Sequence, residues 1–289
     1  MKRKILEILK TLRLLGSINT SFFASPYGKR IRIPLLAGTG LTNEMPSEPW
    51  LHDLLHKMHG IDNGCIVDVG VNIGQTLLKV KSISRDWEYM GFEPNPVCVN
   101  YVSELVFLNK WDKVSIIPAG ISSESMIQQL TLYGDVKSDA SASIVQGFRG
   151  TTTSSRTMWV ATFDVAAIPV LQNRDNIAVV KIDVEGAESL VLEGLQPLLR
   201  RPRPVIICEI LPAYNKENRL RIRAQARVEE ILNANKYRIF HIDKNPQSAF
   251  AGLKSLETIG INADIDRSDY LFLPEEKSLQ YSWLIREKK

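Results

Sequence analysis

The sequence has few cysteines, no long apolar run and no strong excess of either charge. Its 289 residues include only three cysteines, and their spacing matches neither a zinc-binding nor a redox motif. Cys65 and Cys208 lie in apolar runs, where a free thiol behaves as a small hydrophobic group. The scarcity of cysteine excludes a disulfide scaffold, and we expect buried, reduced thiols in a cytoplasmic protein.

The charges are almost balanced. Lys and Arg total 36 and Asp and Glu total 32, which gives a net charge of +4. An excess this small does not indicate a nucleic-acid-binding protein, which gathers basic residues on one face. The apolar fraction of 44% excludes intrinsic disorder. We therefore expect a globular protein with no nucleic-acid partner.

No apolar run is long enough for a membrane-spanning helix, even at the N-terminus. Residues 1–15 carry apolar side chains at helical spacing, but Glu7, Lys10 and Arg13 interrupt them. The pattern predicts a basic amphipathic helix. Such a helix docks on the body of the protein or on the second subunit of a homodimer, or it contacts the inner face of a membrane peripherally. The sequence leaves these alternatives open.

Strands and helices alternate from about residue 64 onward. Strands are predicted at residues 65–69, 89–93, 114–119, 177–183 and 205–210. The last two are continuous apolar runs, typical of strands buried on both faces. Helical patterns follow the first two strands and occupy 187–199, and the chain continues with a helix at 219–235 and strands at 237–242 and 270–273. This alternation predicts an α/β fold with a doubly wound, mostly parallel sheet.

Two segments lie outside this alternation. Residues 1–60 precede the first strand and are predicted to form an N-terminal extension to a domain at 61–289. Residues 122–160 contain a strand-like segment at 128–133, followed by stretches rich in Ser and Thr. This composition predicts an insertion over one edge of the sheet. We expect the extension and the insertion to select the substrate.

Four carboxylates stand at the ends of predicted strands: Asp68, Glu93, Asp183 and Glu209. In doubly wound sheets, ligands bind at the carboxyl ends of the strands. A half-buried carboxylate is also unfavourable unless a partner or a ligand compensates it. We therefore expect these four side chains to converge on one functional site.

The turn after the first strand has the pattern D-x-G-x-N-x-G, with Asp68, Gly70, Asn72 and Gly74. Glycines there permit a tight strand-to-helix turn and a close approach of a ligand to the backbone. Glu93, at the end of the next strand, is placed to accept hydrogen bonds from the hydroxyls of a ribose. Asn72 stands where a dinucleotide-binding turn has the glycine that its pyrophosphate requires. The turn therefore fits a nucleoside ligand without a diphosphate, such as S-adenosylmethionine.

Six segments of the sequence occur in a characteristic order: VDVGVNIG (67–74), GFEPNP (91–96), TFD (162–164), KIDVEGAE (181–188), VLEGL (191–195) and PVIICEI (204–210). In this order they resemble the FkbM family of class I S-adenosylmethionine-dependent methyltransferases, which are mostly bacterial and mostly methylate oxygen. The resemblance spans about residues 64 to 274. It implies a seven-stranded sheet with one antiparallel strand near the C-terminal edge, here at 270–273. The sequence departs from the family at Val71, where alanine is usual.

The resemblance also implies roles for individual residues. The cofactor would be S-adenosylmethionine, with Glu93 on its ribose, Asn95 capping the next helix or facing the adenosine, and the loop at Gly120 facing the adenine. The first loop would contribute Asp68, Gly70, Asn72 and Gly74. The segment with Asp183 and Glu185 would face the methyl group that is transferred.

Methyl transfer is an in-line displacement, so catalysis consists largely of aligning the acceptor with the methyl group. An acceptor hydroxyl must also lose a proton, which a positioned carboxylate accepts. Asp183 or Glu185 would accept it directly, or the two would jointly hold a divalent cation such as Mg²⁺. Lys181 shares a strand face with Asp183 and would lower its pKa, bind substrate or form a structural ion pair. Glu209 would contact the acceptor, act as the base or cap a loop.

The favoured interpretation is O-methylation of a hydroxyl on a sugar, on a glycolipid or polysaccharide, or on a secondary metabolite. A nicotinamide-dependent oxidoreductase is the first alternative, and Asn72 argues against it. The second is a non-catalytic scaffold that keeps the fold and docks through the N-terminal helix. The presence of Asp68, Glu93, Asp183 and Glu185 argues against that alternative.

Overall fold

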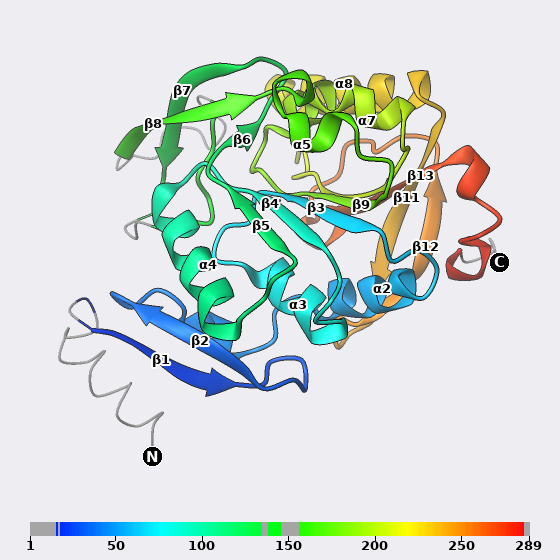
Figure 1. Cartoon of the computed structure of the whole chain (residues 1–289). Coiled ribbons are helices and arrows are strands. Elements are labelled where there is room, and N and C mark those ends of the chain that lie inside the picture. Colours follow the sequence, from blue (N-terminus) through cyan, green and yellow to red (C-terminus); the bar gives the residue numbers. More distant parts are fainter. Residues whose placement is uncertain (1–15, 17, 135–137, 146–155, 286–289) are drawn as a thin grey trace.

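The computed structural model describes residue 16 and residues 18–134, 138–145 and 156–285. The amphipathic helix predicted over residues 1–15 lies outside the described residues. The centre of the protein is an eight-stranded sheet with the order β12-β11-β13-β10-β9-β3-β4-β5 (Figure 1). Its strands are β3 (Cys65–Val69), β4 (Tyr89–Phe92), β5 (Val114–Ile117), β9 (Ile177–Ile182), β10 (Val205–Glu209), β11 (Tyr237–Lys244), β12 (Phe250–Leu256) and β13 (Asp269–Pro274).

Most of the sheet is parallel, as the sequence predicts. The five strands from β5 to β10 pair in parallel, and β13 lies antiparallel between β10 and β11. The antiparallel strand expected at 270–273 is therefore confirmed. The expected number of seven strands is wrong, because β12 pairs antiparallel with β11 and adds an eighth strand at the edge. Its sequence, FAGLKSL, does not alternate strictly between apolar and polar residues.

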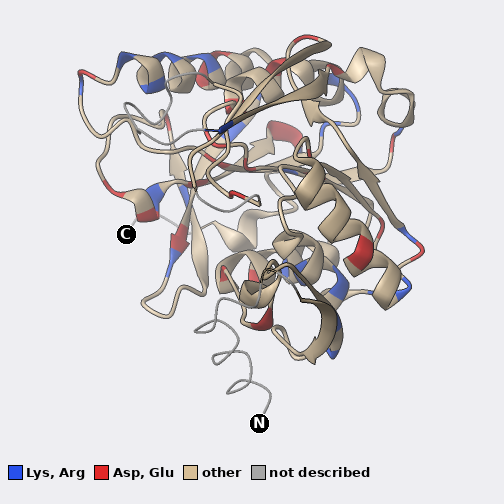
Figure 2. Cartoon of the chain, turned by 90° about the vertical axis from the view of Figure 1, so that its left-hand side faces the viewer, with Lys and Arg blue, Asp and Glu red and all other residues tan. Residues whose placement is uncertain are grey.

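Helices cover both faces of the sheet (Figure 1 and, from a second side, Figure 2). One face packs against α2 (Pro49–His59), α3 (Gln75–Ile83) and α4 (Pro96–Asn109), and the other against α5 (Pro169–Gln172), α6 (Glu188–Gly194), α7 (Gln196–Arg200) and α8 (Arg219–Ala234). The single helix predicted over 187–199 is two helices, α6 and α7, which meet at Leu195. Pro197 has no amide hydrogen to continue the helix, which explains the break.

The described part of the N-terminal extension joins the same core. Strands β1 (Asn19–Ala24) and β2 (Ile31–Leu36) form an antiparallel hairpin, followed by the 3-10 helix η2 (Leu41–Glu44). Ile33 of β2 packs in one hydrophobic cluster with Trp50 and Leu51 of α2 and with Tyr101 of α4. Each such fully buried side chain stabilises the fold by about 1.5–3 kcal/mol. The extension therefore forms part of the hydrophobic core.

The predicted insertion contains most of a second, three-stranded sheet with the order β6-β8-β7. Its strands are β6 (Gly120–Ile121), β7 (Met126–Leu132) and β8 (Arg156–Phe163), and the sheet lies beyond one end of the central sheet (Figure 1). The 3-10 helices η3 (Val165–Ala167), η4 (Ile265–Arg267), η5 (Glu275–Lys277) and η6 (Ser282–Leu284) complete the described structure. No helix in the described ranges is long and apolar enough to span a membrane. All three cysteines are buried and unpaired.

Candidate active site

A pocket lies at the carboxyl ends of β3, β4, β9 and β10, where the sequence places its strand-end carboxylates. It encloses about 1070 Å³ of space, part of which is open to solvent. Nine of the eleven predicted site residues line it: Gly70, Asn72, Glu93, Asn95, Gly120, Lys181, Asp183, Glu185 and Glu209. The other two, Asp68 and Gly74, lie outside its lining.

The turn after β3 is tight because it packs against the end of β9. Gly70 has a φ of +95°, and a Cβ atom at this position would lie 1.9 Å from the backbone oxygen of Asp183. The glycine is therefore required by contact between two loops, before any ligand is considered. Asn72 follows in the left-handed conformation, with φ at +48°. This conformation directs the amide of Asn72 toward Glu93.

Glu93 is fixed by two backbone donors. Its Oε2 accepts from the amide of Asn72 at 2.7 Å, and its Oε1 accepts from the amide of Asn95 at 2.8 Å. The carboxyl is only 6% exposed, and burial raises its pKa to about 7 although both amides favour the ionised form. Asn95 caps α4, because its Oδ1 accepts from the amide of Val97 at 3.0 Å. Each carboxylate oxygen keeps a further lone pair for a ligand hydroxyl.

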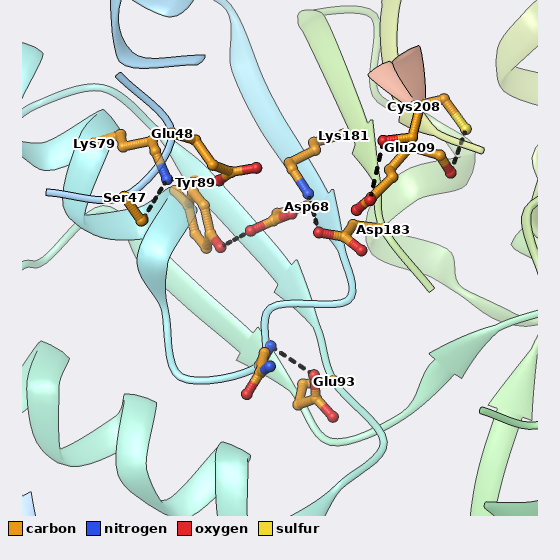
Figure 3. Close-up of polar contacts among 12 residues, drawn as sticks. Ser47, Glu48, Asp68, Lys79, Tyr89, Glu93, Lys181, Asp183, Cys208 and Glu209 are labelled. Carbon is orange, nitrogen blue, oxygen red and sulfur yellow. Dashed lines mark hydrogen bonds and ion pairs between the residues drawn. The ribbon is translucent and has the colours of Figure 1, made fainter. Parts of the chain in front are cut away.

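Asp68 lies beneath the pocket. It is fully buried, and its Oδ2 accepts a short hydrogen bond from the hydroxyl of Tyr89 (Figure 3). Its Oδ1 is buried and has no hydrogen-bond partner among the described residues. Burial raises the pKa of Asp68 to about 6, although the adjacent Lys181 lowers it. Asp68 therefore places a carboxyl group next to the Lys181 ammonium, beneath the pocket, and does not line the pocket itself.

Lys181 and Asp183 form a partly buried ion pair. Lys181 Nζ lies 2.8 Å from Asp183 Oδ2, and the lysine side chain is only 6% exposed (Figure 3). Burial alone would raise the pKa of Asp183, but the Lys181 ammonium and hydrogen bonds from Lys181 and Glu209 hold it below its ordinary value. Asp183 is therefore ionised at neutral pH. The shared strand face that the sequence predicts for the two residues accounts for the pair.

The pKa of Glu209 is shifted in the opposite direction. Burial and the neighbouring Asp183 carboxylate raise the pKa of Glu209 well above its ordinary value. The carboxyl is protonated at neutral pH and can donate a hydrogen bond to Asp183. Ser268 donates to its Oε1 at 3.3 Å. Two neighbouring carboxyl groups thus have different protonation states, the arrangement that enzymes use to divide acid and base roles.

Metal binding at Asp183 and Glu185 has no support in the described part of the chain. No three His, Cys, Asp or Glu side chains there come together in an arrangement that could hold a metal ion. Asp183 instead has the Lys181 ammonium as its counter-charge.

Glu48 is a pocket residue that the sequence did not indicate. It belongs to the N-terminal extension, immediately before α2, and lines the pocket together with Lys181, Asp183 and Glu209. Its Oε2 lies 2.9 Å from Nζ of Lys79, whose side chain is completely buried (Figure 3). In the sequence, an acidic residue before a proline is typical of an ordinary helix start, so nothing distinguished Glu48.

The family model of the methyltransferase FkbM domain matches residues 68–271. The match covers well over half of the sequence, so the chain belongs to the FkbM methyltransferase family. The resemblance carried by the sequence segments is confirmed. A comparison with curated proteins finds no match.

Solved methyltransferase structures are similar in fold at low identity. The FkbM methyltransferase of Methylobacillus flagellatus KT is 13% identical with a TM-score of 0.44, over 72% of this chain and 43% of that longer chain. M. jannaschii TYW2, solved with AdoMet, is 14% identical with a TM-score of 0.39, over 88% and 85% of the two chains. An O-methyltransferase from Bacillus cereus, solved with SAH, is 10% identical with a TM-score of 0.43, over 76% and 78%.

Proposed function

We propose that the protein is an S-adenosylmethionine-dependent O-methyltransferase. Its acceptor would be a hydroxyl of a sugar, of a glycolipid or polysaccharide, or of a secondary metabolite. Membership of the FkbM methyltransferase family supports methyl transfer in general. The observation that carries the choice of cofactor is the anchored Glu93 carboxylate at the end of β4, beside a turn that lacks a diphosphate-binding glycine.

The pocket residues fit this cofactor. Glu93 would bind the ribose hydroxyls with the lone pairs that its two amide donors leave free. Gly120 and Ile121 would face the adenine, and the Gly70 turn would face the methionine part. When bound, S-adenosylmethionine supplies a methyl group on a positively charged sulfur. Asn72 at the position of a pyrophosphate-binding glycine disfavours a nicotinamide dinucleotide.

Asp183 is the proton acceptor in this proposal. It is ionised, lines the pocket and is held in one orientation by Lys181. It would accept a hydrogen bond from the acceptor hydroxyl and take its proton as the methyl group is transferred. Glu209, which is protonated, would orient Asp183 from the other side. Glu185 lines the same pocket and is the alternative base.

Transfer of a radioactive methyl group from labelled S-adenosylmethionine to a panel of sugars, glycolipids and hydroxylated metabolites tests this function. We expect labelled product from at least one hydroxyl acceptor. Because Lys181 already compensates Asp183, we also expect the same rate in the presence of EDTA. Label transferred only to nitrogen would contradict O-methylation. Turnover that requires added Mg²⁺ would contradict catalysis without a metal ion.

A further inference from the structure

Glu48 stands at the end of the pocket away from the proposed ribose carboxylate. In Figure 3, Glu48 lies near Lys79 and Lys181, whereas Glu93 lies on the opposite side of the site. The charge of Glu48 also acts on Lys181 and on Asp269, which places it at the end of the pocket that contains Asp183 and Glu209. This is the end where the proposed acceptor would meet the methyl group.

Three features of the surrounding structure fix the position of Glu48. Lys79, with no exposed side-chain surface, pairs with its carboxylate at 2.9 Å and also donates to Ser47 Oγ at 3.1 Å. The backbone of Glu48 is left-handed, with φ at +44°, a conformation that residues other than glycine rarely adopt. Next to it, the Trp50 amide donates to the Ser248 oxygen at 2.9 Å, which ties the start of α2 to the loop after β11.

Backbone of this kind also occurs at two other residues of the pocket. Glu48, Asn72 and Glu185 are all non-glycine residues with positive φ, and all three line it. Such conformations persist where the surrounding structure enforces them, and they cluster at ligand-binding sites. A helix start that only needed an acidic residue would not require Glu48 to adopt this conformation.

Carboxyl groups dominate this end of the pocket. Glu48 is paired with Lys79, and Asp183 is paired with Lys181. Glu185 and Glu209 line the pocket with them, and the pKa of Glu209 is raised well above its ordinary value. The four carboxyl groups therefore present mainly hydrogen-bond acceptors, and their charge disfavours an anionic ligand. An uncharged ligand with several hydroxyls matches this set, because its hydroxyls donate to carboxylates and accept from an ammonium or a protonated carboxyl.

We propose that Glu48 is an acceptor-binding residue, whose carboxylate accepts a hydrogen bond from a second hydroxyl of an uncharged, polyhydroxylated acceptor. This inference rests on the proposed methyltransferase function. It adds a residue from outside the matched family region and a preference for neutral over anionic acceptors. Glu48 would orient the acceptor so that the hydroxyl to be methylated lies beside Asp183.

The test uses the full chain loaded with S-adenosylhomocysteine and measures binding by ligand-observed NMR and calorimetry. The probes are neutral methyl hexopyranosides, with glucuronate and glucose 6-phosphate as anionic counterparts. The variants are Glu48→Gln, which keeps the shape of the side chain, and the control Glu44→Gln in η2, outside the pocket lining. S-adenosylhomocysteine affinity and the circular dichroism spectrum report whether each variant is folded.

We expect at least one neutral glycoside to bind about tenfold more tightly than its anionic counterparts, which corresponds to about 1.4 kcal/mol. Glu48→Gln should weaken that binding by a similar factor and leave S-adenosylhomocysteine affinity unchanged, and Glu44→Gln should change neither. The inference is overturned if no neutral glycoside binds, if an anionic counterpart binds as tightly, or if Glu48→Gln binds like the wild type. Failure of the wild type to bind S-adenosylhomocysteine would instead count against the proposed function itself.

Discussion

Lys181 and Asp183 stand two residues apart on one face of the chain at the end of β9, and their side chains form an ion pair of 2.8 Å at the edge of the pocket. The pair explains how the Asp183 carboxylate, which is only partly exposed, remains ionised in the site. It also separates the state of Asp183 from that of Glu209, which burial and the Asp183 charge keep protonated. The pKa values of these two neighbouring carboxyl groups are thus shifted in opposite directions.

Replacing Asp183 by asparagine should abolish proton acceptance and keep the shape of the site. We expect kcat to fall by about 100-fold or more, the effect typical of losing a general base. The affinity for S-adenosylmethionine should change little, because the proposed ribose contact is at Glu93. Rates of methyl transfer and calorimetric titrations provide the two measurements. Asp175→Asn is the control, since Asp175 forms an exposed pair with Arg201.

Replacing Lys181 by methionine should destabilise the protein, because it leaves Asp183 without its counter-charge. Removing one partner of a buried pair costs about 3–5 kcal/mol, and we expect about 2–3 kcal/mol here because Asp183 is partly exposed. Urea unfolding measures the change. Arg201→Met removes an exposed pair and should cost less than about 1 kcal/mol. Equal losses of stability in the two variants would show that the Lys181 pair stabilises the fold no more than an exposed pair does.

Gly70→Ala should be strongly destabilising. The added Cβ would lie 1.9 Å from the backbone oxygen of Asp183 at a φ of +95°, so steric overlap adds to conformational strain. We expect a loss of about 3 kcal/mol or more. Gly28→Ala has a similar φ of +76° but no atom within 4 Å of the new Cβ. This control should lose only about 1–2 kcal/mol, so thermal unfolding of both variants separates overlap from strain.

Cofactor affinity should depend on pH through Glu93. Burial raises its pKa to about 7, so the carboxyl is protonated below that pH and ionised above it. Only the ionised form offers both oxygens as acceptors for ribose hydroxyls, so affinity for S-adenosylmethionine should rise as the pH increases through about 7. Glu93→Gln cannot ionise and should flatten this dependence. A pH profile that is the same in the variant would assign the dependence to another group.

Much of the fold follows from local sequence patterns. The buried strands β3, β9 and β10 are mostly apolar runs, and the segment between β9 and β10 has clear helical periodicity. β12 was missed because Gly252 and Lys254 break its alternation, and its strand geometry comes from pairing with β11. The break between α6 and α7 at Leu195 depends on one proline within an otherwise helical pattern.

The residues of the site likewise include some that local sequence patterns predict and some that only tertiary packing brings there. Glu93, Asp183 and Glu209 were predicted because the carboxyl ends of parallel strands meet at one edge, which is a property of the fold. Glu48 reaches the pocket only because α2 packs against the sheet, and Lys79, its partner, is buried by tertiary contacts that helical spacing does not reveal. The ion pair between two residues so far apart in the sequence does not follow from their spacing.

The most direct measurement for the central claim is calorimetric titration of the wild type and Glu93→Gln with S-adenosylhomocysteine and with NAD. The proposed function predicts that the wild type binds S-adenosylhomocysteine at one site, that Glu93→Gln binds it at least about tenfold more weakly, and that NAD does not compete. Tight binding of NAD, or S-adenosylhomocysteine binding that is unchanged by Glu93→Gln, would contradict it.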